Sequence, residues 1–474
     1  MSENEKKYWK SLKDKENDPS IINYKHNEFT KEAIEKFDVE GLSPLSRRRF
    51  LALLSASSAF AVAACADYRD RGEIISYNKK PEEIVYGQPN YYASTCTGCS
   101  NACGVLIKTQ EGRPIKIDGN PEHPVNEGKI CSMGQSSILN LYSPERLQSP
   151  LKRNGGGFSE IKWADVDKEI LSALNAARGA NSEIAIITKK IVSPSAAKLL
   201  KDFTGKYPSA KIYSYEQHND ANRKEGWRLT HGGGSFPLIK WDEAKIILSI
   251  ESDFLSTEGH EIENIRKFVK KRDIANIKDF NRFYAAESRL SATGMNADYR
   301  FAVRPEAQYD FVMSILSELI NNRGMLGVSL DQNLIKGISQ YSLDKLAGEH
   351  KLSIEKLRLL VSDLANNRGS SIAYAGDMAP VDVHAAVNIL NEVLENGSMY
   401  RTDAAEIEFI PLAGKDEFET LVYNMKSKKV DVVIHYDSNP VYHLPKDYGY
   451  ADALKNVPHV VSLTEFANES SVAG

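Results

Sequence analysis

The chain has 474 residues, which is long enough for two or three domains that each bury a hydrophobic core. Its 60 Lys and Arg residues nearly balance its 64 Asp and Glu residues, and the net charge of −4 argues against the broad basic surface of a nucleic-acid-binding protein. We therefore expect no nucleic acid among its partners. All five cysteines lie between positions 65 and 131, so cysteine serves a local chemical task rather than stapling the whole chain.

A polar, lysine-rich segment opens the chain and leads into an export-type signal. Arg47 and Arg48 precede Phe50, and residues 51–64 are apolar or small at every position. This run is too short to cross a bilayer, which needs roughly twenty residues, but it suits the core of a signal peptide. The paired arginines favour the twin-arginine (Tat) translocase as a partner. The alternative is an ordinary buried helix.

The sequence Val62-Ala63-Ala64-Cys65 ends this run and resembles the lipobox of bacterial lipoproteins. The resemblance implies cleavage before Cys65, a lipid on that cysteine, and attachment to a membrane without a spanning helix. The alternative is a plain Tat signal that ends near an ordinary cysteine. We expect a signal region over residues 1–65 and a linker over residues 66–88.

Four cysteines form the most informative pattern in the chain: Cys96, Cys99, Cys103 and Cys131. The first three share one short loop, so their thiolates can wrap a compact cubane cluster, and the distant fourth can close it. The pattern favours a [4Fe-4S] cluster with these four residues as its ligands. Two alternatives stay open, namely a structural zinc ion, which prefers two separated Cys-x-x-Cys pairs, and two disulfides in an oxidising compartment.

The segment between the third and fourth cysteines predicts a β-hairpin. Residues 105–108 alternate as a strand does, Glu111-Gly112 predicts a turn, and residues 114–117 return. Further turn-forming residues follow at 118–126. We expect these turns to bring Cys131 back to the loop that holds the other three cysteines.

Residues 91–134 resemble the small iron-sulfur domain of the dimethyl-sulfoxide-reductase family of molybdopterin oxidoreductases. The resemblance covers the cysteines, the hairpin, Gly119-Asn120-Pro121, His123-Pro124 and the approach from Gly128 to Cys131. It implies a [4Fe-4S] domain over residues 89–147.

The leader resembles one branch of that family. Lys7–Leu12 and His26–Phe29 are similar to the extended translocation region of a group that includes the B subunit of bacterial alternative complex III, a membrane assembly that oxidises quinol. The resemblance implies ferredoxin-like, quinol-interacting and cytochrome subunits as partners. It also implies a lipid-anchored protein on the periplasmic side of the cytoplasmic membrane.

Residues 148–474 alternate apolar strands with helices. Strands that are apolar on both faces are typical of a parallel sheet covered on both sides, which predicts an α/β region of doubly wound, molybdopterin-oxidoreductase-like domains. Because family members continue beyond the final loop, we expect a chain truncated at its C-terminus, as an N-terminal fragment or a split-gene product. The expected strands are 183–188, 245–250, 371–375, 431–435 and 459–463, and the expected helices are 195–207, 382–395 and 451–455.

Ligands of such sheets bind beyond the carboxyl ends of the strands. Asp437–Pro440 and the loop 464–470 resemble cofactor-side loops of the family, although Asn-Pro after a strand is also a common turn. By contrast, Glu251–Phe254 lacks the glycine-containing turn that dinucleotide-binding members usually have.

Further departures from the family pattern weaken the expectation of molybdopterin guanine dinucleotide. Met133 stands where catalytic members carry a lysine between cluster and pterin. In the segment that binds the nucleotide base, Glu306 replaces a glycine and adds negative charge, and Gln308 replaces an acid. No cysteine follows Cys131, so this chain supplies no sulfur ligand to molybdenum, and three other candidate ligands lack a convincing context: Ser214, Asp220 and Ser235.

Three functions are compatible with these patterns. The favoured one is an exported, membrane-associated iron-sulfur electron-transfer subunit of a respiratory oxidoreductase complex. The second is a molybdopterin-dependent oxidoreductase of the polysulfide or dimethyl-sulfoxide reductase type. The third is a cofactor-free assembly module whose cysteines are vestigial or disulfide-bonded. Catalytic residues stay unassigned, because spacing identifies no catalytic constellation and the histidines are scattered, among them His218, His231 and His260.

Overall fold

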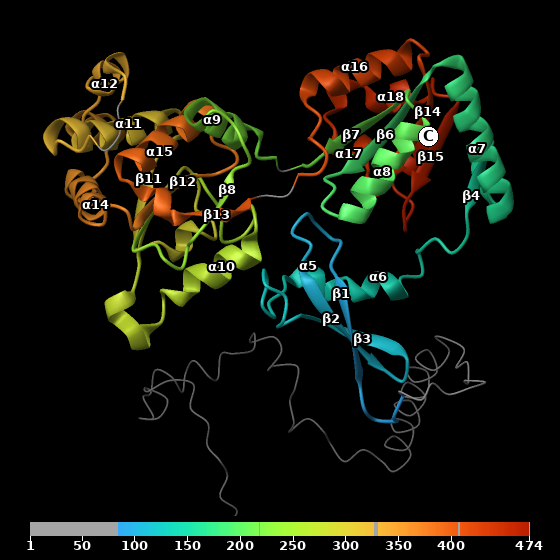
Figure 1. The fold of residues 1–474 in the computed structure, drawn as a ribbon, viewed down its shortest axis with the longest axis horizontal. Helices are drawn as coiled ribbons and strands as arrows, with labels where there is room; N and C mark the ends of the chain where they lie inside the picture. The colour runs from blue at the N-terminus through green and yellow to red at the C-terminus, as the bar shows by residue number, and fades with distance from the viewer. Residues whose placement is uncertain (1–83, 218, 327–329, 406–407, 474) are drawn as a thin grey trace, which may run out of the picture. The chain divides into compact units, whose positions relative to one another are not determined.

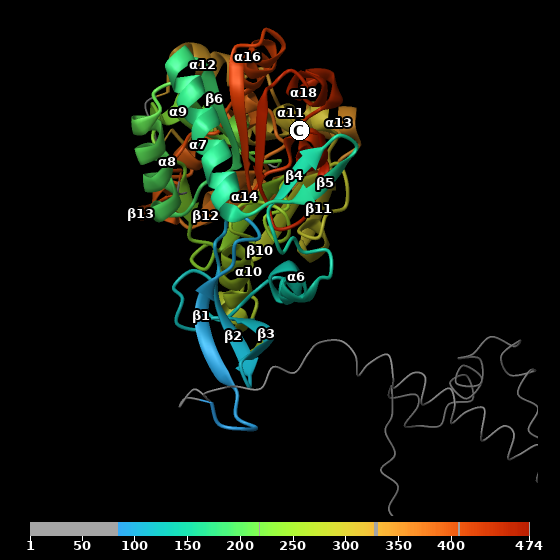
Figure 2. The same ribbon diagram turned by 90° about the vertical axis from the view of Figure 1, so that its right-hand side faces the viewer.

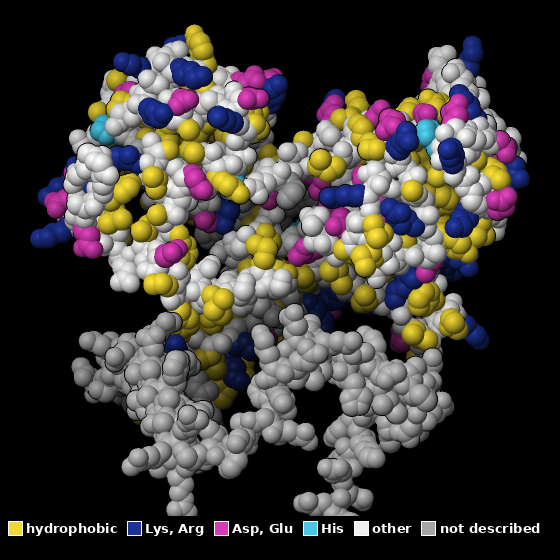
Figure 3. Space-filling model, turned by 180° about the vertical axis from the view of Figure 1, so that it is seen from behind, with side chains coloured by type: hydrophobic (Ala, Val, Ile, Leu, Met, Phe, Trp, Pro, Cys, Tyr) yellow, Lys and Arg dark blue, Asp and Glu magenta, His cyan; other side chains and the backbone are white. Residues whose placement is uncertain are grey.

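The computed structural model describes residues 84–217, 219–326, 330–405 and 408–473. The signal residues Arg47 and Arg48, the lipidation candidate Cys65 and His218 lie outside the described residues. Within the described part of the chain, no helix is both long and apolar enough to cross a bilayer. On the face shown in Figure 3, Lys and Arg side chains are interspersed with Asp and Glu, so charge of one sign does not dominate that face.

A three-stranded antiparallel sheet, in the order β1-β2-β3, contains the predicted hairpin (Figure 1). Glu111 and Gly112 form its turn with φ angles of 51° and 83°. Two positive φ angles match the twist of a tight hairpin and favour glycine in the second position. The elements of this module are β1 (Asn90–Thr95), β2 (Gly104–Gln110), β3 (Arg113–Gly119), α5 (Ser132–Ser136) and α6 (Ile138–Tyr142).

Four parallel strands form the first α/β sheet, in the order β15-β14-β6-β7 (Figures 1 and 2). Along its central strand, Ile184 and Ile186 pack with α7 and α8, whereas Ala185 and Ile187 pack with α16 and α18. Both faces are therefore covered, which explains the uninterrupted apolar runs. The strands are β6 (Glu183–Lys189), β7 (Ala210–Tyr215), β14 (Val430–Tyr436) and β15 (His459–Leu463).

The helices of this region flank the sheet and its loops. They are α7 (Trp163–Ala180), α8 (Pro194–Lys206), α16 (Lys415–Lys426), α17 (Pro440–His443), α18 (Tyr450–Leu454) and α19 (Glu469–Ala473). A hairpin of β4 (Leu151–Asn154) and β5 (Gly157–Glu160) precedes them. The prediction of a loop over 464–470 is wrong at its end, because Glu469 begins α19.

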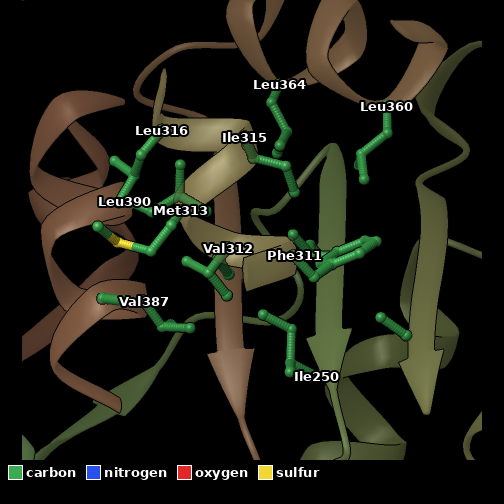
Figure 4. Packing of buried hydrophobic residues seen from close by; sticks show 14 of the residues in the cluster. Ile250, Phe311, Val312, Met313, Ile315, Leu316, Leu360, Leu364, Val387 and Leu390 are labelled. Carbon is green, nitrogen blue, oxygen red and sulfur yellow. The ribbon is translucent and has the colours of Figure 1, made fainter. Parts of the chain in front are cut away.

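Four more parallel strands form the second α/β sheet, in the order β11-β10-β9-β12. Figure 4 shows Ile250 of this sheet packed with Phe311 and Val312, beside apolar residues of two further helices. The strands are β9 (Ile246–Ile250), β10 (Arg282–Glu287), β11 (Tyr299–Ala302) and β12 (Ser371–Ala375). The helices are α9 (Ala221–His231), α10 (Glu261–Lys270), α11 (Gln308–Ser317), α12 (Gln332–Ile338), α13 (Leu343–His350), α14 (Ile354–Asn366) and α15 (Val381–Val393).

The second sheet is inserted into the first along the chain, because its strands fall between β7 and β14. The chain passes from the first sheet to the second and back again, and the strands on these two passages pair antiparallel. They are β8 (Pro237–Ile239) and β13 (Tyr400–Ala405). The predicted fold class is confirmed: a small β-rich domain is followed by α/β regions with parallel sheets. Each of the five predicted strands is confirmed to within one residue at either end, whereas β7, β10, β11 and the insertion were not predicted.

Candidate iron-sulfur site

The first three cysteines lie in the loop that joins β1 to β2. Cys96 follows β1 directly, and its backbone N–H donates to the carbonyl of Cys103 at 2.8 Å, which closes the loop at its base. Within the loop, Ala102 takes a left-handed conformation with φ of 46°. The antiparallel pairing of β1 with β2 thus brings three thiols of one short segment together.

Asn126 holds the returning chain against the start of β2. Its side chain is fully buried, accepts from the Gly104 N–H at 2.9 Å, and donates to the carbonyls of Gly104 at 2.9 Å and Lys129 at 2.7 Å. Nearby, a Cβ on Gly119 would come within 2.6 Å of the backbone of Gly128. Glycine is therefore required at this close approach, and the clamp brings the fourth cysteine toward the other three.

Cys131 forms the N-cap of α5. Its Sγ accepts from the Gly134 N–H at 3.3 Å, in the position where a serine or aspartate oxygen commonly caps a helix. A Cβ on Gly134 would come within 2.7 Å of the Ile130 side chain, so this turn is tightly packed. Its sulfur is thereby fixed by backbone geometry rather than by a flexible loop.

The four thiols act on one another electrostatically. Burial, followed by the charges of Cys99, Cys96 and Cys131, raises the pKa of the Cys103 thiol to about 11. Burial is also the largest cause that raises the pKa of Cys99. Crowded thiols with raised pKa values are protonated at neutral pH, so metal binding must displace their protons.

The state of the four cysteines bears on the choice between a cluster, a zinc ion and two disulfides. All four are free thiols in the structure, and none is part of a disulfide. Among the described residues, no group of three or more His, Cys, Asp or Glu side chains is placed so that it could hold a metal ion, and this includes the four cysteines. The crowded but unpaired thiols agree with ligands that each hold a different iron of one cubane.

Side chains of two residues, Arg266 and Lys189, join the cysteine module to the α/β regions. Arg266 of α10 contacts Glu127 at 2.5 Å and donates to the Val125 carbonyl at 3.3 Å. From the first sheet, the Lys189 ammonium donates to the Thr97 carbonyl, inside the cysteine loop, at 2.8 Å. Lys189 was not predicted as a site residue from the sequence. Its position at the end of an apolar strand is the one local signal that it offers. Met133, by contrast, is 71% exposed on α5.

The predicted loops at the carboxyl edge of the first sheet do come together. The Asn439 amide donates to Glu469 at 2.7 Å and accepts from the Ser470 hydroxyl at 2.8 Å. The Asn439 N–H donates to the Tyr215 hydroxyl at 3.2 Å, and the pKa of Tyr215 is raised by burial. Both segments that resemble cofactor-side loops therefore meet, but their polar groups already bind each other.

The carboxyl edge of the second sheet is closed by its own side chains. Glu251, directly after β9, has φ of 48°, and its carboxylate accepts from the Ser288 N–H at 2.8 Å and the Gln308 amide at 2.6 Å. A Cβ on Gly376 would lie 2.2 Å from the Glu251 carbonyl oxygen, so the loop after β12 covers this turn. Glu306 is exposed and pairs with Arg304 at 3.9 Å.

The three other candidate molybdenum ligands do not form a site. Two of them are engaged with other groups of the protein, and the third is exposed. Ser214 is buried and donates to the Lys189 carbonyl at 3.3 Å, Asp220 is ion-paired with Arg223 at 3.1 Å, and Ser235 is exposed. Two of the histidines also have ordinary surroundings. His231 stacks on Trp227 with ring centroids 3.6 Å apart, and burial lowers the pKa of His260.

Known proteins resemble the chain in two adjacent stretches. Residues 89–143 match the molybdopterin oxidoreductase Fe4S4 domain, and residues 146–298 match the molybdopterin oxidoreductase family. The menaquinone reductase, molybdopterin-binding-like subunit of Nitratidesulfovibrio vulgaris is 25% identical over 90% of this chain and 64% of that protein. A sulfite dehydrogenase subunit of Allochromatium vinosum is 40% identical, over 40% of this chain and 18% of its own length.

Structural similarity supports the same fold. Acetylene hydratase from Pelobacter acetylenicus matches with a TM-score of 0.62 at 16% identity, over 80% of this chain and 62% of that one. The chain thus spans less than two thirds of both the hydratase and the menaquinone reductase subunit. Residues 89–143 and 146–298 thus carry the Fe4S4 and molybdopterin domains of molybdopterin oxidoreductases.

Proposed function

We propose that this chain is an iron-sulfur electron-transfer subunit of a respiratory oxidoreductase complex. Cys96, Cys99, Cys103 and Cys131 would hold one [4Fe-4S] cluster, which supplies one-electron transfer when bound. The observation that carries the proposal is the convergence of four free thiols in the domain that matches the family's Fe4S4 module. Relatives named as subunits of a menaquinone reductase and a sulfite dehydrogenase support a role within a larger complex.

The second sheet argues that this role does not include a guanine dinucleotide. A bound phosphate needs unpaired N–H donors and a backbone free to approach, which glycine turns supply. Here the Ser288 N–H is taken by the Glu251 carboxylate, and that carboxylate adds a negative charge at this edge of the sheet. The residues at this edge therefore do not fit the nucleotide, and we assign no step to a pterin.

The location of the protein belongs to the same proposal. Export through the Tat translocase would use Arg47 and Arg48, and a lipid on Cys65 would hold the protein at the periplasmic side of the cytoplasmic membrane. Ferredoxin-like, quinol-interacting and cytochrome subunits would be its partners. Replacing Cys65 by serine should move the protein from the membrane to the soluble fraction of the periplasm; continued membrane retention in cells without partner subunits would contradict the lipid anchor.

A molybdopterin-dependent oxidoreductase is the second candidate. One observation favours it, namely the match of residues 146–298 to the molybdopterin oxidoreductase family. It requires a nucleotide site that the second sheet does not offer. A cofactor-free assembly module is the third, and it requires that the four thiols bind no iron.

Paramagnetic resonance of anaerobically purified protein tests the proposed function. After reduction with dithionite, the wild-type chain should give the resonance of a reduced [4Fe-4S] cluster. Cys99→Ala should abolish that resonance, because Cys99 is one of the four proposed ligands and the described part of the chain holds no other free cysteine. An unchanged spectrum in the variant would reject the ligand assignment, and no iron signal in the wild type would leave the assembly module.

A further inference from the structure

A lysine of the first sheet makes a hydrogen bond to the backbone of the cysteine loop. Lys189 is the last residue of β6, and its ammonium donates to the Thr97 carbonyl at 2.8 Å across 92 residues of sequence. Resting on the proposed function, we infer that Lys189 is a positioning residue that raises the reduction potential of the cluster held by the four cysteines.

The peptide group that Lys189 binds lies in the cysteine loop, between Cys96 and Cys99 along the chain. Thr97 and Gly98 share this peptide, and a Cβ built on Gly98 would lie 3.7 Å from the Cys96 Sγ. A charged donor on the carbonyl polarises the peptide and strengthens its own N–H as a donor. Hydrogen bonds and charges near the sulfurs are main determinants of a cluster's potential. Lys189 can therefore act on the cluster without being one of its ligands.

The position of Lys189 is fixed by the sheet. Its carbonyl accepts from the hydroxyls of Thr188 at 3.1 Å and Ser214 at 3.3 Å, which anchors the end of β6. Its ammonium also forms an ion pair with Asp437, the first residue after β14. Both side chains keep substantial exposure, 40% for Lys189 and 60% for Asp437, so solvent screens their mutual attraction as well as their effect on the cluster, and a modest shift is expected.

The sign of the effect follows from charge. One-electron reduction adds a negative charge to the cluster and breaks no bond, so a nearby cation favours the reduced form and raises the potential. The opposing carboxylate of Asp437 partly offsets the cation. Removing Lys189 should lower the potential, whereas removing the charge of Asp437 should raise it.

Redox titration of the full-length, cluster-loaded protein, with dithionite as reductant and the cluster resonance as readout, tests this pair of signs. We expect Lys189→Met to shift the potential downward, Lys189→Arg to restore it close to the wild-type value, and Asp437→Asn to shift it upward. Asparagine tolerates the left-handed backbone of Asp437, whose φ is 46°, so that variant is expected to fold and keep its cluster.

Lys211→Met is the matched control. Lys211 is a half-exposed, ion-paired lysine of the same sheet, bonded to Glu183 at 2.9 Å near the opposite end of the strands. A Lys189→Met shift no larger than that of Lys211→Met, or a downward shift in Asp437→Asn, would overturn the inference while the cluster itself is present. Wild-type protein without a cluster would instead overturn the proposed function and this inference with it.

Discussion

The carboxyl edges of the two parallel sheets share a local backbone feature, but the side chains there have different partners. In each sheet a non-glycine acid follows a central strand with positive φ, Asp437 after β14 and Glu251 after β9. Asp437 is 60% exposed and pairs with Lys189, which contacts the cysteine loop. Glu251 instead binds Ser288 and Gln308 inside its own region.

On the proposed function, this difference would let one fold keep an electron-transfer site while it loses a nucleotide site. An edge whose polar groups bind each other offers no donors to a ligand, however similar its strands remain to those of ligand-binding relatives. An edge with an exposed ion pair can still act on a neighbouring site. The following substitutions are ordered from the largest expected effect to the smallest.

Loss of one cysteine ligand should have the largest effect, because the cysteine loop contacted by Lys189 should then no longer bind the cluster. Cys103→Ser removes the most buried of the four thiols and should abolish or strongly reduce the iron content of purified protein. Cys65→Ser is the matched control, because it changes the fifth cysteine by the same chemistry. Equal iron in both variants would refute the separate roles of these cysteines.

Adding a methyl group at the carboxyl edge of the second sheet should destabilise the fold. Gly376→Ala places a Cβ 2.2 Å from the Glu251 oxygen and 2.6 Å from the Ser252 Cα, both backbone atoms that cannot move freely. We expect a loss of about 3 kcal/mol in the free energy of unfolding, measured by urea denaturation. Gly205→Ala, in α8 with no atom within 4 Å of its Cβ, should be neutral or slightly stabilising. Similar behaviour of the two variants would argue against a closed edge.

The first sheet should be acid-sensitive where it buries His435. Burial lowers the pKa of His435 from 6.5 to about 4, so the unfolded chain binds the proton more tightly. The contribution of neutral His435 is complete above about pH 6.5 and is lost as the pH falls toward 4, up to about 3 kcal/mol. His435→Gln should flatten the pH dependence of unfolding in this window. His459→Gln, at an exposed position of β15, is the control, and equal slopes in the two variants would contradict the assignment.

Exchanging the amide and the carboxylate of Gln308 and Glu251 tests whether these two side chains act as a pair at the carboxyl edge of the second sheet. Gln308→Glu would place two carboxylates at a contact that is now 2.6 Å long, with an expected cost of about 2 kcal/mol. The double variant Glu251→Gln with Gln308→Glu should recover most of this loss, because amide and carboxylate merely change sides. Asp437→Asn at the exposed edge should cost less than about 0.5 kcal/mol. Absence of rescue in the double variant would show that the two side chains do not act as a pair.

The sequence allowed prediction of the parts that depend on local pattern. The apolar runs of β6, β9, β12, β14 and β15 were recognisable because both faces of each strand are buried. β10 and β11 were missed because they carry Arg282 and Arg300, which are neutralised by partners distant in sequence. The insertion of one sheet into the other depends on strand pairing that no local signal encodes.

The site divides in the same way. The cysteine spacing predicted the cluster module, since all four residues lie in one short stretch. The contacts that tune or close the sites are long-range: Lys189 reaches Thr97 from 92 residues away, and Gln308 reaches Glu251 from 57 residues away. Such pairs involve common polar residues and become visible only when the chain is folded.

The metal and nucleotide content of one anaerobically purified sample of the wild-type chain tests the central claim most directly. The account predicts about four iron atoms per chain, with neither molybdenum nor a guanine nucleotide released on denaturation. Stoichiometric molybdenum together with guanine nucleotide would contradict it, because it would require a dinucleotide site at an edge that Glu251 and Gln308 close.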